Sequence, residues 1–283
     1  MERKTALKIN SEKRETKFFT SVATSNDEST HNIGITSDGI AYTWGKSNSL
    51  GQLGRDGKKN TPQQALFSDP IQATCNGKGE KSKQTKLIQT KAAKGFVGGT
   101  TDAGHSAILD ENGYLWFTGC DRWQQLGLGS SAAGAAGYTW TALWQETFQR
   151  NDHLRVLMKS KTNTNDGIEI RDVAIGGDHT LVLSNNRKDV FSFGKGREGQ
   201  LGLQSEKPFV SSPVHAKALS STKDEIAAVC AVRHCSFTLD DRGNLLKSSG
   251  KCKRWNSEFM TKVLKHCQEG ARMDGLIAND GSR

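Results

Sequence analysis

The fold is decided by the stretch His31-Asn-Ile-Gly-Ile-Thr-Ser-Asp-Gly39, which is followed by Gly51-Gln-Leu-Gly54. The same order of residues returns from His105 and from His179, so that successive copies start 74 residues apart. A fourth, degenerate copy has Cys235 in place of the histidine and lacks the Gly-Gln-Leu-Gly element. Repetition at a fixed period indicates a repeat architecture in which each copy is one supersecondary unit.

Each copy predicts a β-hairpin. Apolar residues alternate after the histidine, as at Ile33 and Ile35, and such alternation buries one face of a strand. Asp38-Gly39 and Asn112-Gly113 then provide the positive φ angle of a tight turn. In the third copy Asn185-Asn186-Arg187-Lys188 replaces this turn with one extra residue, and a longer loop around an asparagine is expected. Hairpins of this kind cannot bury their faces alone, so they pack against one another as blades.

The other repeated residues are predicted to be structural. Aromatic side chains recur on the second strand, and one leucine recurs between the two glycines of the bend; both sets are expected in the core. These residues are Tyr42, Trp44, Trp116, Phe191 and Phe193, with Leu53, Leu126 and Leu201. The recurrent histidines and glutamines are expected to make hydrogen bonds that tie strands to neighbouring backbone, because buried polar side chains are normally paired. The glutamines are Gln52, Gln125 and Gln200.

The order of histidine, apolar strand, Asp-Gly turn, Trp44-Gly45 and Gly-Gln-Leu-Gly resembles the repeat of the regulator of chromosome condensation family. The resemblance covers roughly residues 17–250. It implies an all-β fold: a partial or short β-propeller of about four blades, whereas the family usually has seven. An open arc of blades leaves unpaired strand edges, through which two copies of the chain can pair as a homodimer.

The chain is expected to divide into three segments. Residues 1–16 form a basic N-terminal tail, residues 17–250 carry the repeats, and residues 251–283 form a C-terminal tail with a short helix. Within the repeats, a Lys-rich insertion near 76–95 is predicted to be a loop. The aromatic stretch 138–148 is predicted to be a strand or a short helix that covers a blade.

Charge and composition narrow the class of protein. The net charge of +9 comes from the tails and the insertion, not from the repeated body. The longest apolar run, 226–232, is too short to span a membrane, and the N-terminus lacks the apolar segment of a secretory signal. The six cysteines form no Cys-x-x-Cys pair, so we expect free thiols and an intracellular location, in the cytoplasm or the nucleus.

No catalytic constellation is recognisable in the sequence. Gly194-Lys-Gly-Arg-Glu-Gly199 matches the dinucleotide-binding pattern, but no helix start follows it and the repeat explains it fully. A zinc site built from Cys230, His234, Cys235 and Cys252 would have irregular spacing. We therefore expect no cofactor, no metal ion and no enzymatic activity.

The loops after the Trp-Gly position differ in chemistry between the copies. Variable loops on a rigid scaffold are where such proteins bind partners. Arg122, Trp123 and Arg197 lie in these loops, and Arg and Trp are enriched at interaction hot spots. We predict that these three residues contact a partner protein; an ordinary solvated loop is the alternative.

Lys81, Lys83 and Lys86 of the insertion are candidates for binding nucleic acid or an acidic protein patch, with a flexible solvated loop as the alternative. The sequence as a whole favours a non-catalytic scaffold that binds another protein. Two alternatives stay open. One is guanine-nucleotide exchange on a small GTPase, which the resemblance implies, and the other is chromatin or nucleic-acid binding through the insertion.

Overall fold

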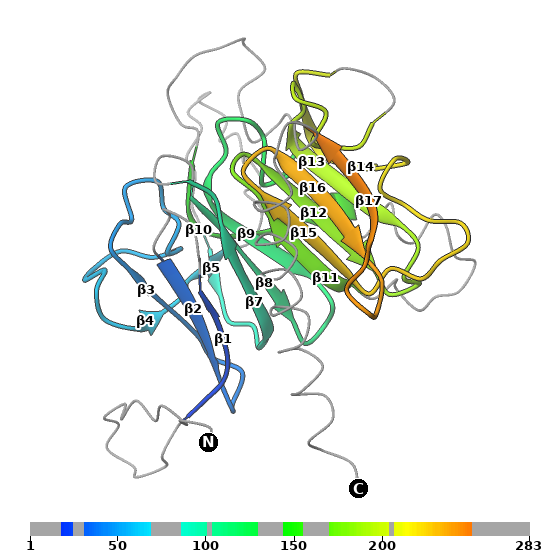
Figure 1. Cartoon of the computed structure of the whole chain (residues 1–283). Helices are drawn as coiled ribbons and strands as arrows, with labels where there is room; N and C mark the ends of the chain where they lie inside the picture. Colours follow the sequence, from blue (N-terminus) through cyan, green and yellow to red (C-terminus); the bar gives the residue numbers. More distant parts are fainter. Residues whose placement is uncertain are drawn as a thin grey trace, which may run out of the picture. The chain divides into compact units, whose positions relative to one another are not determined.

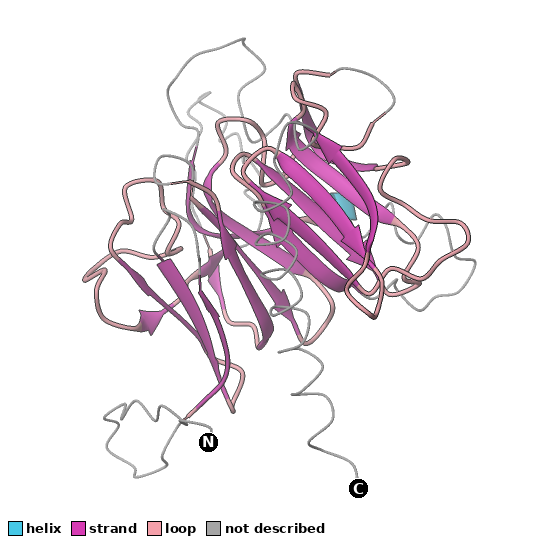
Figure 2. Cartoon of the chain, viewed as in Figure 1, coloured by secondary structure: helices cyan, strands magenta, loops and turns pink. Residues whose placement is uncertain are grey.

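The computed structural model describes residues 18–24, 31–68, 86–100, 104–129, 144–154, 170–203 and 207–250. Their regular structure is β apart from one helical turn at 152–154 (Figure 1 and Figure 2). The chain divides into two compact units, Met1–Asp121 with Thr139–Asp152 and Arg122–Tyr138 with His153–Arg283. Each unit holds two sheets, so the predictions of an all-β fold and of four blades are confirmed. The predicted C-terminal helix lies outside the described residues.

The first unit contains blades 1 and 2. Blade 1 is an antiparallel sheet of β1 (Phe19–Thr24), β2 (His31–Thr36), β3 (Ala41–Gly45) and β4 (Gln63–Gln64). Blade 2 consists of β7 (Ala92–Gly98), β8 (His105–Asp110), β9 (Leu115–Cys120) and β10 (Trp144–Arg150), extended beyond β10 by β5 (Phe67–Ser68) and β6 (Leu87–Ile88). Ile33 of blade 1 packs with Ile108 and Trp116 of blade 2 in one hydrophobic core.

The second unit contains blades 3 and 4. Blade 3 is built from β11 (Ile170–Ile175), β12 (His179–Ser184), β13 (Val190–Lys195) and β14 (Phe209–His215). Blade 4 consists of β15 (Ala228–Val232), β16 (Cys235–Leu239) and β17 (Leu245–Gly250). Leu181 and Val190 of blade 3 pack with Val229 of blade 4. Among the described residues β17 is an unpaired edge of blade 4, and pairing of two chains through such an edge stays a prediction.

Three expectations from the sequence need correction. The loop predicted near 76–95 is wrong at its C-terminal end, where β6 and most of β7 lie; Lys94 and Gly95, of types depleted in strands, concealed β7 in the sequence. The stretch 138–148, predicted to be a strand or a short helix, does provide the strand β10, but this strand is part of blade 2 and does not cover a blade. Cys230 is disulfide-bonded, so the prediction of free thiols is wrong at this residue. Among the described residues, we find no helix of the length and apolarity needed to cross a bilayer.

The Gly-Gln-Leu-Gly element forms a tight bend around its buried leucine, as predicted. Leu53 is completely buried, and Gly54 has a φ angle of 61°, which a side chain rarely adopts. A Cβ atom at Gly54 would also collide with the Phe148 ring of blade 2. In the second copy Gln124, with a φ angle of 64°, takes the place of the first glycine. The bend therefore allows close packing between neighbouring blades.

The aromatic side chains of the second strands are core residues in blades 2 and 3, but less so in blade 1. Trp116, Phe191 and Phe193 are at most 2 % exposed, whereas Tyr42 and Trp44 are only half-buried. The Phe19 ring stacks on Trp44 with a centroid distance of 5.7 Å. The core prediction is therefore confirmed for the fully buried rings and overstated for the first copy.

The recurrent histidines join neighbouring blades through a hydroxyl group. His31 Nε2 lies 2.8 Å from Ser106 Oγ, and this hydroxyl donates to the Gln52 carbonyl at 2.7 Å. Because the single hydroxyl proton goes to the carbonyl, the imidazole Nε2 must carry the proton that the serine accepts. The second unit repeats the relay with His179, Ser236 and Gln200, at 2.8 and 2.6 Å. The structural role predicted for the histidines is confirmed, with a serine between imidazole and backbone.

Arg55 orders the long loop of blade 1 from a buried position. Its guanidinium and Nε donate to the hydroxyl and carbonyl of Thr43, to the side chain of Gln63 and to three loop carbonyls. Burial lowers the pKa of Arg55 from its ordinary value. This role was not predicted, although Arg55 stands where the second and third copies have a leucine after the bend.

Asp240 at the β16–β17 turn provides a test through pH. The side-chain amide of Asn244, its backbone N–H and that of Arg242 all donate to the Asp240 carboxylate, and these bonds lower its pKa. A carboxyl with a lowered folded-state pKa stabilises the fold above the unfolded value of about 4, and this contribution is lost as pH falls through the folded value. We expect Asp240→Asn to flatten the acid limb of stability against pH, measured by urea unfolding below about pH 5. Identical acid limbs would contradict this.

Candidate protein-interaction surface

The loops after β9 and β13 bring an aromatic ring and two cations together. Trp123 lies in the first loop, Lys195 ends β13, and Arg197 lies in the second loop. Lys195 Nζ is 5.1 Å and Arg197 Cζ is 5.5 Å from the centroid of the Trp123 ring, within the range of cation–π attraction. With the adjacent Arg122, these residues form what we call the basic–aromatic surface, and all four belong to the second unit.

The basic–aromatic surface presents charge outward from a partly buried base. Arg122 and Arg197 are exposed, whereas Trp123 and Lys195 are half-buried. An exposed guanidinium above an indole offers planar N–H donors beside an apolar ring. Such a combination can bind an anionic group and bury apolar surface at the same time.

Lys195 is held by two carboxylates. Its Nζ lies 3.3 Å from Asp178 Oδ2 and 4.0 Å from Glu198 Oε2, and its backbone N–H donates to the Asp178 carbonyl at 2.8 Å. These contacts fix the ammonium group beside the Trp123 ring. The prediction of the site missed Lys195 and Asp178. Lys195 directly follows Gly194, which corresponds to Gly45 of the Trp-Gly pair in the first copy.

The β15–β16 turn adds a further cation to this part of the second unit. The Arg233 carbonyl accepts a hydrogen bond of 2.8 Å from the N–H of Gly177, which neighbours Asp178. Arg233 is exposed and has a φ angle of 49°. The Arg233 backbone therefore lies beside the residue that precedes Asp178 in blade 3.

Four backbone amides of the segment that matches the dinucleotide-binding pattern are already bonded within the chain. The N–H groups of Lys195, Gly196 and Gly199 donate to backbone carbonyls, and that of Glu198 donates to Gln200 Oε1. The described residues after Gly199 form a turn, without the helix start that this ligand needs. The explanation by the repeat therefore holds.

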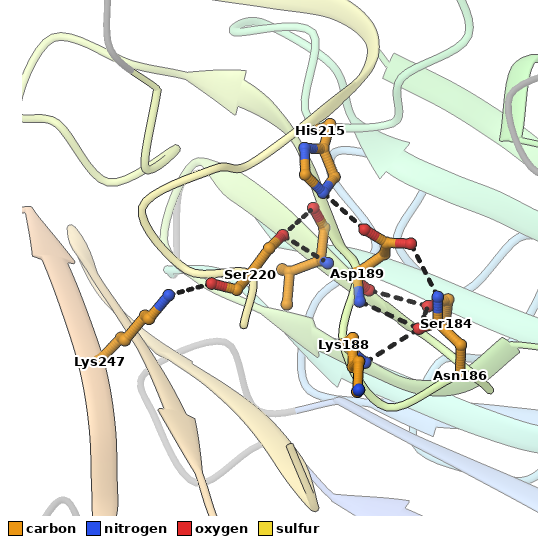
Figure 3. A network of polar contacts seen from close by, with 8 residues as sticks. Ser184, Asn186, Lys188, Asp189, His215, Ser220 and Lys247 are labelled. Carbon is orange, nitrogen blue, oxygen red and sulfur yellow. Dashed lines mark hydrogen bonds and ion pairs between the residues drawn. The ribbon is translucent and has the colours of Figure 1, made fainter. Parts of the chain in front are cut away.

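A second cluster of titratable groups lies at the β12–β13 turn (Figure 3). His215 Nε2 is 2.7 Å from Asp189 Oδ1, and Asn186 Nδ2 donates to Asp189 Oδ2 at 2.7 Å. Asn186 Oδ1 in turn accepts bonds from the Lys188 and Asp189 backbone and from the Ser184 hydroxyl. The network holds the turn, which has the predicted extra residue. Its left-handed residue is Arg187, with a φ angle of 56°, and not an asparagine.

The lysines predicted to bind nucleic acid are only partly within the described chain. Lys86 is exposed just before β6 in the first unit. Lys81 and Lys83 lie outside the described residues. Their role stays a prediction.

Comparison with known proteins identifies relatives of the repeats. Residues 189–239 and residues 170–200 match models described as "Regulator of chromosome condensation (RCC1) repeat". A "Protein RCC2 homolog" from Danio rerio is 30% identical over 222 residues, covering 76% of this chain and 39% of the relative. A "Secretion-regulating guanine nucleotide exchange factor" from Bos taurus is 26% identical over 216 residues, covering 74% of this chain and 36% of the relative. The chain thus spans less than two fifths of the length of these relatives.

Solved structures share the fold. The crystal structure of Kap60 bound to yeast RCC1 (Prp20) aligns with a TM-score of 0.55 at 17% identity, covering 85% of this chain and 45% of that one. The crystal structure of human WBSCR16 aligns with a TM-score of 0.51 at 17% identity, covering 81% of this chain and 46% of that one. At such low identity these alignments concern the fold alone.

Proposed function

Because this chain belongs to the regulator of chromosome condensation repeat family, we propose that it is a non-catalytic module that binds another protein through the basic–aromatic surface. The placement of Lys195 and Arg197 beside the ring of Trp123 carries the proposal. The hydrophobic core that blades 3 and 4 share gives the loop after β13 a rigid support, and functional loops in proteins are commonly mounted on such a scaffold. Arg and Trp at such a place are the residue types that contribute most to binding.

Site-specific photocrosslinking tests the proposal. A photoreactive amino acid at Arg122 is expected to crosslink the partner in cells. The control position is Lys217, which is exposed and follows the end of β14, whereas the start of β14 pairs with Lys195. No crosslink is expected there. Replacing Trp123 and Arg197 together by alanine is expected to weaken partner binding about tenfold or more. A partner bound by the unmodified protein should show no covalent modification. Equal crosslinking at both positions, or binding unaffected by the double substitution, would contradict the proposal.

Guanine-nucleotide exchange is a second candidate, favoured by the name of the bovine relative. It predicts that micromolar protein accelerates nucleotide release from a small GTPase. A release assay over a panel of GTPases separates the two functions. A non-catalytic module leaves every release rate unchanged, and clear acceleration of any one would replace our proposal.

A further inference from the structure

A buried amide group beside the basic–aromatic surface lacks a partner among the described residues. Gln125 is completely buried, and its Nε2 atom makes no hydrogen bond there. A buried polar group left unpaired destabilises the fold, so an unpaired N–H group in a native protein calls for a physical explanation. The Gln125 Oε1 atom, in contrast, accepts a bond of 2.8 Å from the Trp123 backbone.

Blade 3 shows what fills the equivalent place. There Gln200 Oε1 accepts a bond of 3.0 Å from the Glu198 backbone, so the turn has the same geometry. Gln200 Nε2 donates to the Glu198 carboxylate at 3.2 Å, and this carboxylate lies 4.0 Å from Lys195 Nζ. Blade 2 has Trp123 where blade 3 has Glu198. The turns of the two blades therefore have the same backbone arrangement, and the turn of blade 2 lacks the carboxylate that blade 3 has.

Cations that would attract a carboxylate are already in place around Trp123. Lys195 and Arg197 both lie beside its ring. Arg197 is exposed, and its guanidinium has no hydrogen bond or ion pair within the described part of the chain. Guanidinium and carboxylate groups form strong, planar, charge-assisted hydrogen bonds.

We propose that the basic–aromatic surface binds an aspartate or glutamate side chain of an acidic peptide segment. The carboxylate of that side chain accepts a hydrogen bond from Gln125, as the Glu198 carboxylate accepts one from Gln200. The carboxylate accepts from Gln125 Nε2 and pairs with Arg197, while the Trp123 ring moves aside and packs on the peptide. This inference rests on the proposed function and names the chemistry of its partner. A nucleic-acid backbone fits less well, because a duplex carries its phosphates on a broad surface, whereas the Gln125 amide is completely buried.

Replacing Trp123 tests the proposal in a way that simple loss of contact does not. Trp123→Glu supplies the missing carboxylate from within the chain, as blade 3 does, and is expected to weaken binding of a fluorescein-labelled octaglutamate peptide about tenfold or more. Trp123→Ala leaves the carboxylate site open but removes the ring that packs on the peptide, and is expected to weaken binding by about threefold, clearly less than Trp123→Glu. The melting temperature of Trp123→Glu should be at least as high as that of Trp123→Ala, because the buried amide gains a partner.

The measurements use the full chain in low salt and fluorescence anisotropy. A neutral peptide of Ser and Gly and a duplex DNA of equal charge serve as controls, and neither is expected to bind as tightly as the octaglutamate peptide. Arg197→Ala should weaken peptide binding about tenfold. Equal affinity of Trp123→Glu and wild type, equal loss in both Trp123 variants, or tighter binding of DNA would overturn the inference. If crosslinking at Arg122 succeeds while octaglutamate fails to bind, the proposed function stands and only the carboxylate chemistry falls.

Discussion

Replacing Asp110 by alanine is expected to lower the free energy of unfolding by about 4 kcal/mol, because a buried indole and three partly buried donors lose their acceptor. Asp110 is 3 % exposed, and its carboxylate accepts hydrogen bonds from Trp116 Nε1 at 2.8 Å and from the Thr90 hydroxyl at 3.1 Å. It also accepts from the backbone N–H groups of Asn112 and Tyr114, both at 2.9 Å. One side chain thus caps the β8–β9 turn and fixes the buried indole of blade 2.

Asp240 is the matched control, because it caps the equivalent turn of blade 4 at the protein surface. Asp240→Ala removes the same backbone bonds but strands no buried indole, so its destabilisation should be clearly smaller. Urea unfolding of both variants, followed by circular dichroism, measures the difference. Equal losses would show that the buried Trp116 contact contributes nothing to stability.

Replacing His179 by alanine is expected to cost about 3 kcal/mol, since it opens a cavity and leaves the Ser236 hydroxyl without its donor. His179 is completely buried between blades 3 and 4, and the Ser236 hydroxyl donates a hydrogen bond to the Gln200 carbonyl. A double-mutant cycle with Ser236→Ala should give a coupling energy of about 1 kcal/mol or more, as residues in one hydrogen-bond network do.

His31 and Ser106 provide an independent copy of this cycle in the first unit. Comparable coupling energies in both units would show that the histidine–serine–carbonyl hydrogen bonds stabilise both units in the same way. Strictly additive effects in both cycles would mean that the histidines act by packing alone. A relay of this kind accounts for recurrent histidines without any catalytic role.

Much of the fold could be predicted because its signals are local. The Asp-Gly turns and the Gly-Gln-Leu-Gly bends depend on backbone angles that few residues adopt. The role of Ser106 and Ser236 was missed, although a hydroxyl residue follows the histidine position in each later copy. That role appears only when two copies are compared, because the hydroxyl forms a hydrogen bond with the histidine of the preceding blade. β7 was missed, and a strand and a helix could not be separated for β10, because neither has a regular alternation of apolar residues.

The candidate site was predicted in part. Trp123 and Arg197 were chosen for their residue types, and the structure brings them together in one unit. The unpaired amide of Gln125 was not foreseeable, since the glutamine series was interpreted as uniformly satisfied. Alignment of Trp123 with Glu198 held the clue, but its meaning depends on which atoms the buried amide reaches.

Amide hydrogen exchange of the full chain, with and without its bound partner, tests most directly whether the loops around Trp123 are the functional surface. We expect the partner to slow exchange at residues 122–127 and 195–200, while the hairpin turns at Gly113 and Gly243 exchange unchanged. Slower exchange confined to those turns or to residues 86–98, with the Trp123 loops unaffected, would contradict the assignment.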